Sequence, residues 1–177
     1  MTHAELIFFC DPTGYWRYPN IDKPWAYDGF AYATDSRIIA RVPSDPTESP
    51  ILVPDGVPPA HRLEWWGRFP LPEGDAIAGV IIPAEPARVK CRDCRSWGGR
   101  KHCESCDKSG TVAPDESAVV VAGESFAPVY LRKLAAMPGL RSQVGRIKGL
   151  GALLFQSGEL CGAVMAMHVW PKTGGAA

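Results

Sequence analysis

The chain has 177 residues, of which 46% are hydrophobic and six are tryptophan, so it holds enough apolar material for one domain with its own core. Its 19 basic and 19 acidic residues cancel, so the whole-chain charge gives no reason to expect strong nucleic-acid binding. No apolar run approaches the roughly 20 residues of a membrane-spanning helix, and the N-terminal residues do not read as a secretory signal. We therefore expect a soluble, cytoplasmic protein.

A meander of three short strands is predicted after an apolar run that periodicity cannot assign. That run covers residues 4–10, where Phe8 and Phe9 favour a strand. Runs of β-forming residues then alternate with turn signals: strands at 25–27, 30–34 and 37–43, with turns at Asp28-Gly29 and Asp35-Ser36. Because Asp-Gly between β-forming residues favours a hairpin, we expect these strands to pair in sequence order.

Residues 43–74 are rich in proline, which excludes a long helix or a central strand there. We expect Trp65, Trp66 and Phe69 to pin this excursion to the domain; the alternative is an exposed patch for a partner. A strand at 75–83 then leads into a cysteine-rich segment, and a strand at 117–122 leads out of it. That segment is therefore predicted to be an insertion between two strands.

Two Cys-x-x-Cys pairs within the insertion form the most specific motif of the chain. Cys91 pairs with Cys94, Cys103 pairs with Cys106, and the residues between the pairs are polar and glycine-rich. Each pair offers two thiolates from one tight turn, and two such turns complete the tetrahedral shell of Zn²⁺. Since four thiolates leave no position for water, we expect a structural zinc ion that holds the module together without a core.

Other interpretations of the cysteines stay open. A disulfide scaffold would require an oxidising compartment, and a redox Cys-x-x-Cys is usually a single pair beside a βαβ unit. His102 adjoins Cys103 and could replace one thiolate in the zinc shell. The remaining cysteines, Cys10 and Cys161, lie among apolar residues and are expected to be buried thiols.

One confident helix and a last hairpin are predicted after the insertion. Ser125 is the candidate N-cap of the helix, Pro128 lies in its first turn, and Pro138-Gly139 ends it. Its apolar face is expected to carry Val129, Tyr130, Leu134 and Met137. Strands at 151–155 and 160–169 follow, joined by a turn at Gln156-Ser157-Gly158.

Two stretches of the chain resemble a known fold family. Residues 118–169 resemble the last βαββ unit of a bacterial DNA polymerase sliding clamp domain, through the helical run Phe126-Ala127-Pro128-Val129-Tyr130-Leu131 and the closing strand Val164-Met165-Ala166-Met167. The hairpin at 28–37, with Ala33-Thr34-Asp35 before a basic residue, resembles a strand-turn-strand of the same clamps. The resemblance implies a clamp-like fold but not a clamp ring, since a clamp chain has several such domains and its helices are more basic.

The cysteine module looks like half of the zinc domain of DnaJ-type chaperones, and small clamp-like domains with such an insertion resemble proteins that bacteriophages encode. The predicted fold is thus a single sliding-clamp-like α+β domain, an antiparallel sheet with one main helix, carrying an inserted zinc knuckle. Residues 1–84 and 115–170 would form the domain, residues 85–114 the four-cysteine zinc module, and residues 171–177 a disordered tail.

No catalytic constellation stands out, because the histidines are scattered, no Ser or Cys lies in a nucleophile motif, and no phosphate-binding loop is present. The leading hypothesis is a non-enzymatic, phage-type zinc-binding protein that binds a protein partner of DNA replication or host defence, in the host cytoplasm if phage-encoded. The module would make that contact, since Arg and Trp are enriched in interface hot spots. The expected contact residues are Arg92, Arg95, Trp97, Arg100 and Lys101.

The alternative function is that of a nucleic-acid-binding accessory factor. In that case Arg88 and Lys90 would join the basic residues of the module in contacting phosphates, and Trp97 would stack on a base. The sequence leaves the oligomeric state open, a homo-oligomer included.

Overall fold

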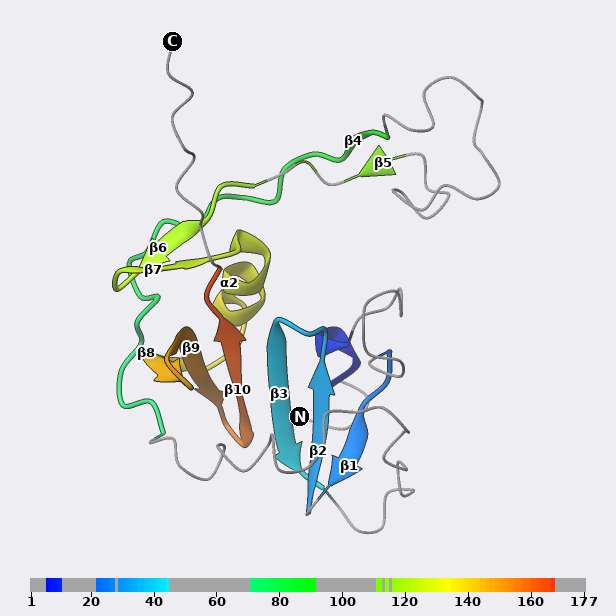
Figure 1. Cartoon of the computed structure of the whole chain (residues 1–177), viewed down its shortest axis with the longest axis vertical. Coiled ribbons are helices and arrows are strands. Elements are labelled where there is room, and N and C mark those ends of the chain that lie inside the picture. The colour runs from blue at the N-terminus through cyan, green and yellow to red at the C-terminus, as the bar shows by residue number, and fades with distance from the viewer. Residues whose placement is uncertain are drawn as a thin grey trace.

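A six-stranded antiparallel sheet, in the order β1-β2-β3-β10-β9-β8, is the centre of the fold (Figure 1). The computed structural model describes residues 6–10, 22–27, 29–44, 71–91, 111–112, 114 and 116–167. The strands of the sheet are β1 (Trp25–Tyr27), β2 (Phe30–Thr34), β3 (Ile38–Pro43), β8 (Arg141–Ile147), β9 (Leu150–Ser157) and β10 (Leu160–Met165).

The N-terminal meander and the C-terminal meander meet at the pairing of β3 with β10, where Ile38 lies opposite Val164 and Arg41 opposite Cys161. The close fit at this seam depends on Gly162. A Cβ at that position would meet the ring of Phe155 and would lie 2.5 Å from the carbonyl oxygen of Ile39. Because Gly162 has no side chain, the Phe155 ring can lie directly against its backbone.

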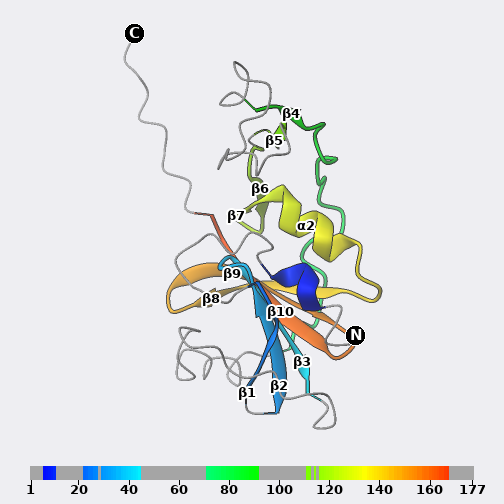
Figure 2. The ribbon, with the colours of Figure 1, turned by 90° about the vertical axis from the view of Figure 1, so that its right-hand side faces the viewer.

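One face of the sheet is covered by α2 (Pro128–Ala135) and by the short 3₁₀ helix η1 (Ile7–Phe9). Leu131 and Leu134 of α2 are fully buried in the same cluster as Leu153, Phe155 and Val164 of the sheet. Figure 2 shows α2 and η1 above this face, and the Lys133 ammonium donates a hydrogen bond to the Phe8 carbonyl at 2.9 Å. The α-helix is thus fixed to the sheet by its buried leucines.

Two small hairpins complete the described elements. β6 (Val119–Val121) pairs with β7 (Glu124–Phe126) beside α2, and β4 (Val89–Lys90) pairs with β5 (Thr111–Val112) away from the sheet (Figure 1). The backbone N–H of Met167, just past β10, donates to the carbonyl of Ser125 at 2.7 Å and so ties β7 to the end of the sheet. The described chain is an α+β fold of mainly antiparallel strands with one α-helix.

Several sequence predictions are confirmed. The three strands of the N-terminal meander, the strand that leaves the insertion and the last hairpin are all present, as β1, β2, β3, β6, β9 and β10. The bounds of β1 and β2 agree with the turn signals, since Asp-Gly favours a hairpin turn, whereas β9 extends to Ser157 inside the predicted turn and β10 ends at Met165.

One predicted strand is wrong, and the unassigned apolar run near the N-terminus does not form the strand that Phe8 and Phe9 favoured. Residues 7–9 form η1, whose end is closed by a hydrogen bond from Cys10 N–H to the Ile7 carbonyl at 3.1 Å. Residues 75–83 make only an isolated bridge, Asp75 to Ser142, and then turn through Gly79, which has a φ of 76°. A short apolar run is compatible with a strand, a helix or a turn, so composition alone does not decide its structure.

The edge strand β8 was not predicted. Its sequence, from Arg141 to Ile147, has few apolar residues, and only Ser142 and Ile147 are buried. An edge strand tolerates polar and charged side chains, so it lacks the alternation that identifies an inner strand.

The helix prediction needs two corrections. Ser125 lies in β7 and not at the N-cap, which is Ala127 without a side-chain hydrogen bond; Pro128 does occupy the first turn. The buried face is formed by Pro128, Leu131 and Leu134, whereas Val129 is 41% exposed. The proline excursion with Trp65, Trp66 and Phe69, and the tail 171–177, lie outside the described residues.

Candidate metal centre

The structure describes one of the four predicted zinc ligands. Cys91 directly follows β4, and its side chain is 2% exposed. The other proposed ligands Cys94, Cys103 and Cys106 lie outside the described residues, as do His102 and the proposed contact residues Arg92, Arg95, Trp97, Arg100 and Lys101. Within the described segments no three His, Cys, Asp or Glu side chains gather as a metal site would require, and the zinc site stays a prediction.

The β4–β5 ladder joins the two ends of the cysteine-rich segment. Val89 lies opposite Val112, and Lys90 lies opposite Thr111, in antiparallel register. Paired strands are about 5 Å apart, so the chain enters and leaves residues 91–110 at one place. A four-cysteine module needs this closure, because its two cysteine pairs must converge on one ion.

A first arginine ties the two strands of this ribbon together. The Arg88 guanidinium donates from Nε to Thr111 Oγ1 at 3.0 Å and from Nη2 to the Thr111 carbonyl at 2.9 Å. Arg88 was a proposed phosphate contact, and the structure places two of its donor groups on the opposite strand.

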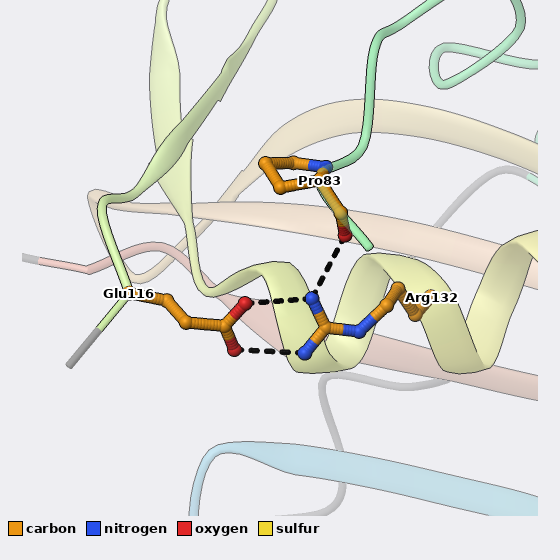
Figure 3. A network of polar contacts seen from close by, with 3 residues as sticks. All are labelled: Pro83, Glu116 and Arg132. Atoms are coloured by element: carbon orange, nitrogen blue, oxygen red, sulfur yellow. Dashed lines mark hydrogen bonds and ion pairs between the residues drawn. The ribbon is translucent and has the colours of Figure 1, made fainter. Parts of the chain in front are cut away.

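A second arginine contacts the two segments that connect the sheet domain to the β4–β5 ribbon (Figure 3). Arg132 of α2 donates from Nη1 to the Pro83 carbonyl at 2.9 Å, and from Nη1 and Nη2 to the two carboxylate oxygens of Glu116 at 2.7 Å each. This fork-on-fork geometry is the strongest form of an ion pair between side chains. The hydrogen bonds from Arg132 lower the pKa of the Glu116 carboxyl.

The β2–β3 turn and α2 touch each other at Asp35. Its Oδ1 accepts hydrogen bonds from the backbone N–H groups of Arg37 at 2.9 Å and Ile38 at 3.0 Å, which fix the β2–β3 turn. Its Oδ2 accepts from the Tyr130 hydroxyl of α2 at 2.9 Å. Ser36 takes a φ of 77° in this turn. The contact holds the helix to the hairpin, and this is a structural use of the carboxylate.

The two thiols outside the insertion differ in burial. Cys10 is buried as predicted, and burial raises the pKa of its thiol to about 11, so the thiol stays protonated at neutral pH. Cys161 is only half-buried and accepts a hydrogen bond from Arg41 Nε at 3.4 Å. The Arg41 guanidinium also lies over the Phe30 ring, 4.3 Å from its centroid. Neither thiol shows the electropositive, open setting of a reactive cysteine together with a base.

Sequence reasoning missed the role of Arg132. Its partners Pro83 and Glu116 lie on either side of the insertion, and no local pattern in the helix indicates that it reaches them. The only available signal was a basic residue on a helix whose neighbours Leu131 and Leu134 are apolar.

Comparisons with protein-family models, with curated proteins and with solved structures return no match for this chain. In the described segments, no helix has the length and apolar character needed to cross a membrane.

Proposed function

We propose that this chain is a non-enzymatic zinc-binding protein, in which the cysteine module at residues 85–114 recognises a protein partner and the sheet domain carries the module. The burial of Cys91 is the observation that supports the metal site. Val89 is 47% exposed and Lys90 is also exposed, whereas the next side chain, Cys91, is 2% exposed. A zinc thiolate must leave water in this way, because four sulfur ligands surround the ion completely.

The position of the ribbon supports a role in recognition. β4 and β5 lie away from the six-stranded sheet, and the segment that they close carries the basic and aromatic residues typical of interface hot spots (Figure 1). A metal-held segment on a tied ribbon would lose little conformational entropy when a partner binds. The likeness to sliding clamps and to phage proteins suggests a partner in DNA replication or host defence.

The polar groups of the sheet domain support a non-enzymatic role. The Asp35 carboxylate accepts two backbone N–H groups and the Tyr130 hydroxyl, and the Glu116 carboxylate accepts both ends of the Arg132 guanidinium. Carboxylate oxygens that already accept fixed donors are poorly placed to take a proton from a substrate, and the hydrogen bonds from Arg132 also lower the pKa of Glu116.

Metal analysis of the purified protein tests the first half of the proposal. We expect one zinc per chain in the wild type and loss of that zinc in Cys94→Ser, since three thiolates leave the shell open. Cys161→Ser is the matched control. The Cys161 thiol lies in the sheet and accepts a hydrogen bond from Arg41, so its replacement should leave the zinc content unchanged. A wild-type zinc content far below one equivalent would contradict the proposal.

Partner capture from host lysate, followed by affinity measurement, tests the second half. The double variant Trp97→Ala with Arg100→Ala should weaken partner binding by more than about 2 kcal/mol, roughly 30-fold, while zinc content and melting temperature stay unchanged. Arg141→Ala, an exposed basic residue of β8, is the control and should bind normally. An unchanged affinity in the double variant would move the contact away from the module.

A salt titration of the same complex distinguishes a protein interface from the nucleic-acid alternative. Phosphate contacts would make log K fall steeply with log[salt], whereas a protein interface led by aromatic residues responds little. Binding of duplex or single-stranded DNA with a steep salt slope would favour the accessory-factor hypothesis instead.

A further inference from the structure

The segments that lead into and out of the insertion pass the same side chain beside the sheet domain. Pro83 belongs to the outgoing segment and Glu116 to the returning segment, and the Arg132 guanidinium lies between them with hydrogen bonds to both (Figure 3). One planar cation therefore sets the spacing of Pro83 and Glu116, through three hydrogen bonds of 2.7–2.9 Å.

A second set of ties lies further out, next to the cysteines. Arg88 bonds Thr111 across the ribbon, and the β4–β5 ladder pairs Lys90 with Thr111 directly before Cys91. Between the two sets, Pro86 and Pro114 each fix one backbone φ at about −65°. Ties at both ends limit how far the intervening segments can bend relative to the sheet domain.

The base of this segment is anchored to the core of the fold. Arg132 follows Leu131 in α2, and both Leu131 and Leu134 are 0% exposed against the sheet. The helix backbone cannot turn about its axis without exposing these leucines to water, which is unfavourable. The point from which the Arg132 side chain leaves the helix is therefore fixed relative to the sheet.

The adjacent basic residue points elsewhere. Lys133 donates to the Phe8 carbonyl at 2.9 Å and its ammonium lies 5.9 Å from the centroid of the Tyr130 ring. It thus serves the contact between α2 and η1. This difference gives a matched pair of variants on one turn of one helix.

We infer that Arg132 is a positioning residue: it orients the β4–β5 ribbon, which closes the cysteine module, relative to the sheet domain, so that a protein partner meets the ribbon and the sheet domain as one surface. The inference deepens the proposed function and rests on it for the role of the module. The orientation itself depends only on contacts of Arg132, Pro83, Glu116 and Arg88.

Backbone ¹⁵N relaxation of the zinc-loaded full chain tests the inference. In the wild type, the amides of Val89, Lys90 and Val112 should report the same rotational correlation time as those of β9 and β10. In Arg132→Gln, the correlation time of the ribbon amides should fall by about a third or more, because the ribbon then moves independently. The sheet amides and the zinc content should not change.

Lys133→Gln is the control, since it also removes a cation from α2 but leaves the ties to Pro83 and Glu116 intact. Glu116→Gln removes the charged acceptor without altering the helix, so it replaces Arg132→Gln if that variant folds poorly. The exchange of charges, Arg132→Glu with Glu116→Arg, should restore part of the lost correlation time.

Ribbon amides that tumble independently in the wild type, or that keep their correlation time in both Arg132→Gln and Glu116→Gln, would overturn the inference. The proposed function fails separately, through a wild-type protein with far less than one zinc per chain. If the ribbon is rigid in the wild type and loosens in Arg132→Gln, but the protein holds no zinc, the inference about Arg132 is supported and the proposed zinc site is wrong.

Discussion

Leu134 lies at the contact between the helix and the sheet, where its side chain is 0% exposed. Leu134→Ala should lower the free energy of unfolding by about 2–5 kcal/mol, because the substitution removes buried methyl groups and leaves a cavity. Val129→Ala on the same helix should change it by no more than about 0.5 kcal/mol, since Val129 is 41% exposed. Urea unfolding followed by circular dichroism measures both, and a small effect of Leu134→Ala would place the helix on the surface.

Gly162 offers a second test at the scale of a single residue. Gly162→Ala should destabilise the fold by about 1–3 kcal/mol, because the new methyl group must displace the Phe155 ring and the Ile39 backbone. Gly145→Ala is the control, since a Cβ there would lie 3.5 Å from Leu154 Cδ1, an ordinary contact distance. Thermal melts that rank the two variants equally would contradict the packing of this seam.

At the scale of elements, the ion pair between Arg132 of α2 and the segment that returns from the insertion depends on the charge of Glu116. Its pKa is lowered by the hydrogen bonds from Arg132, so the folded state favours the ionised carboxylate. The stabilisation is therefore present above the ordinary pKa of a glutamate, about 4.3, and is lost as the pH falls through the lower folded value.

A titration of the Glu116 side-chain carboxyl by ¹³C NMR measures this shift directly. Its midpoint should lie below that of a glutamate in a peptide in the wild type and should return toward the ordinary value in Arg132→Gln. A midpoint for Glu116 equal to that of a glutamate in a peptide would show that the ion pair does not form in solution.

At the scale of the whole molecule, the core and the insertion are separate in composition. Among the described residues, the largest fully buried side chains belong to the sheet, to α2, to the β6–β7 hairpin and to Leu6 at the N-cap of η1, and they include Trp25, Phe126 and Phe155. Cys94→Ser should therefore abolish zinc binding yet preserve a cooperative thermal transition of the sheet domain. Scanning calorimetry decides this, and loss of all cooperative unfolding would show that the module and the sheet form one folding unit.

The sequence alone determined the elements whose signals are local. The β1–β2–β3 meander and the β9–β10 hairpin follow from runs of β-forming residues broken by Asp-Gly and Ser-Gly, and the helix from Pro128 at its start and Pro138-Gly139 at its end. The spacing of the cysteines is a signal of the same kind, and it predicts a metal site whose other ligands Cys94, Cys103 and Cys106 lie outside the described residues.

Tertiary structure decided what no local pattern encodes. Residues 7–9 form a 3₁₀ helix and residues 76–79 form turns, where the Ala76 N–H donates to the Ser142 carbonyl of β8. Tertiary structure also selected Leu131 over Val129 for the buried face of α2. Above all, it brought Arg132 to Pro83 and Glu116, since an ion pair between residues far apart in the chain exists only after the sheet has placed the helix between them.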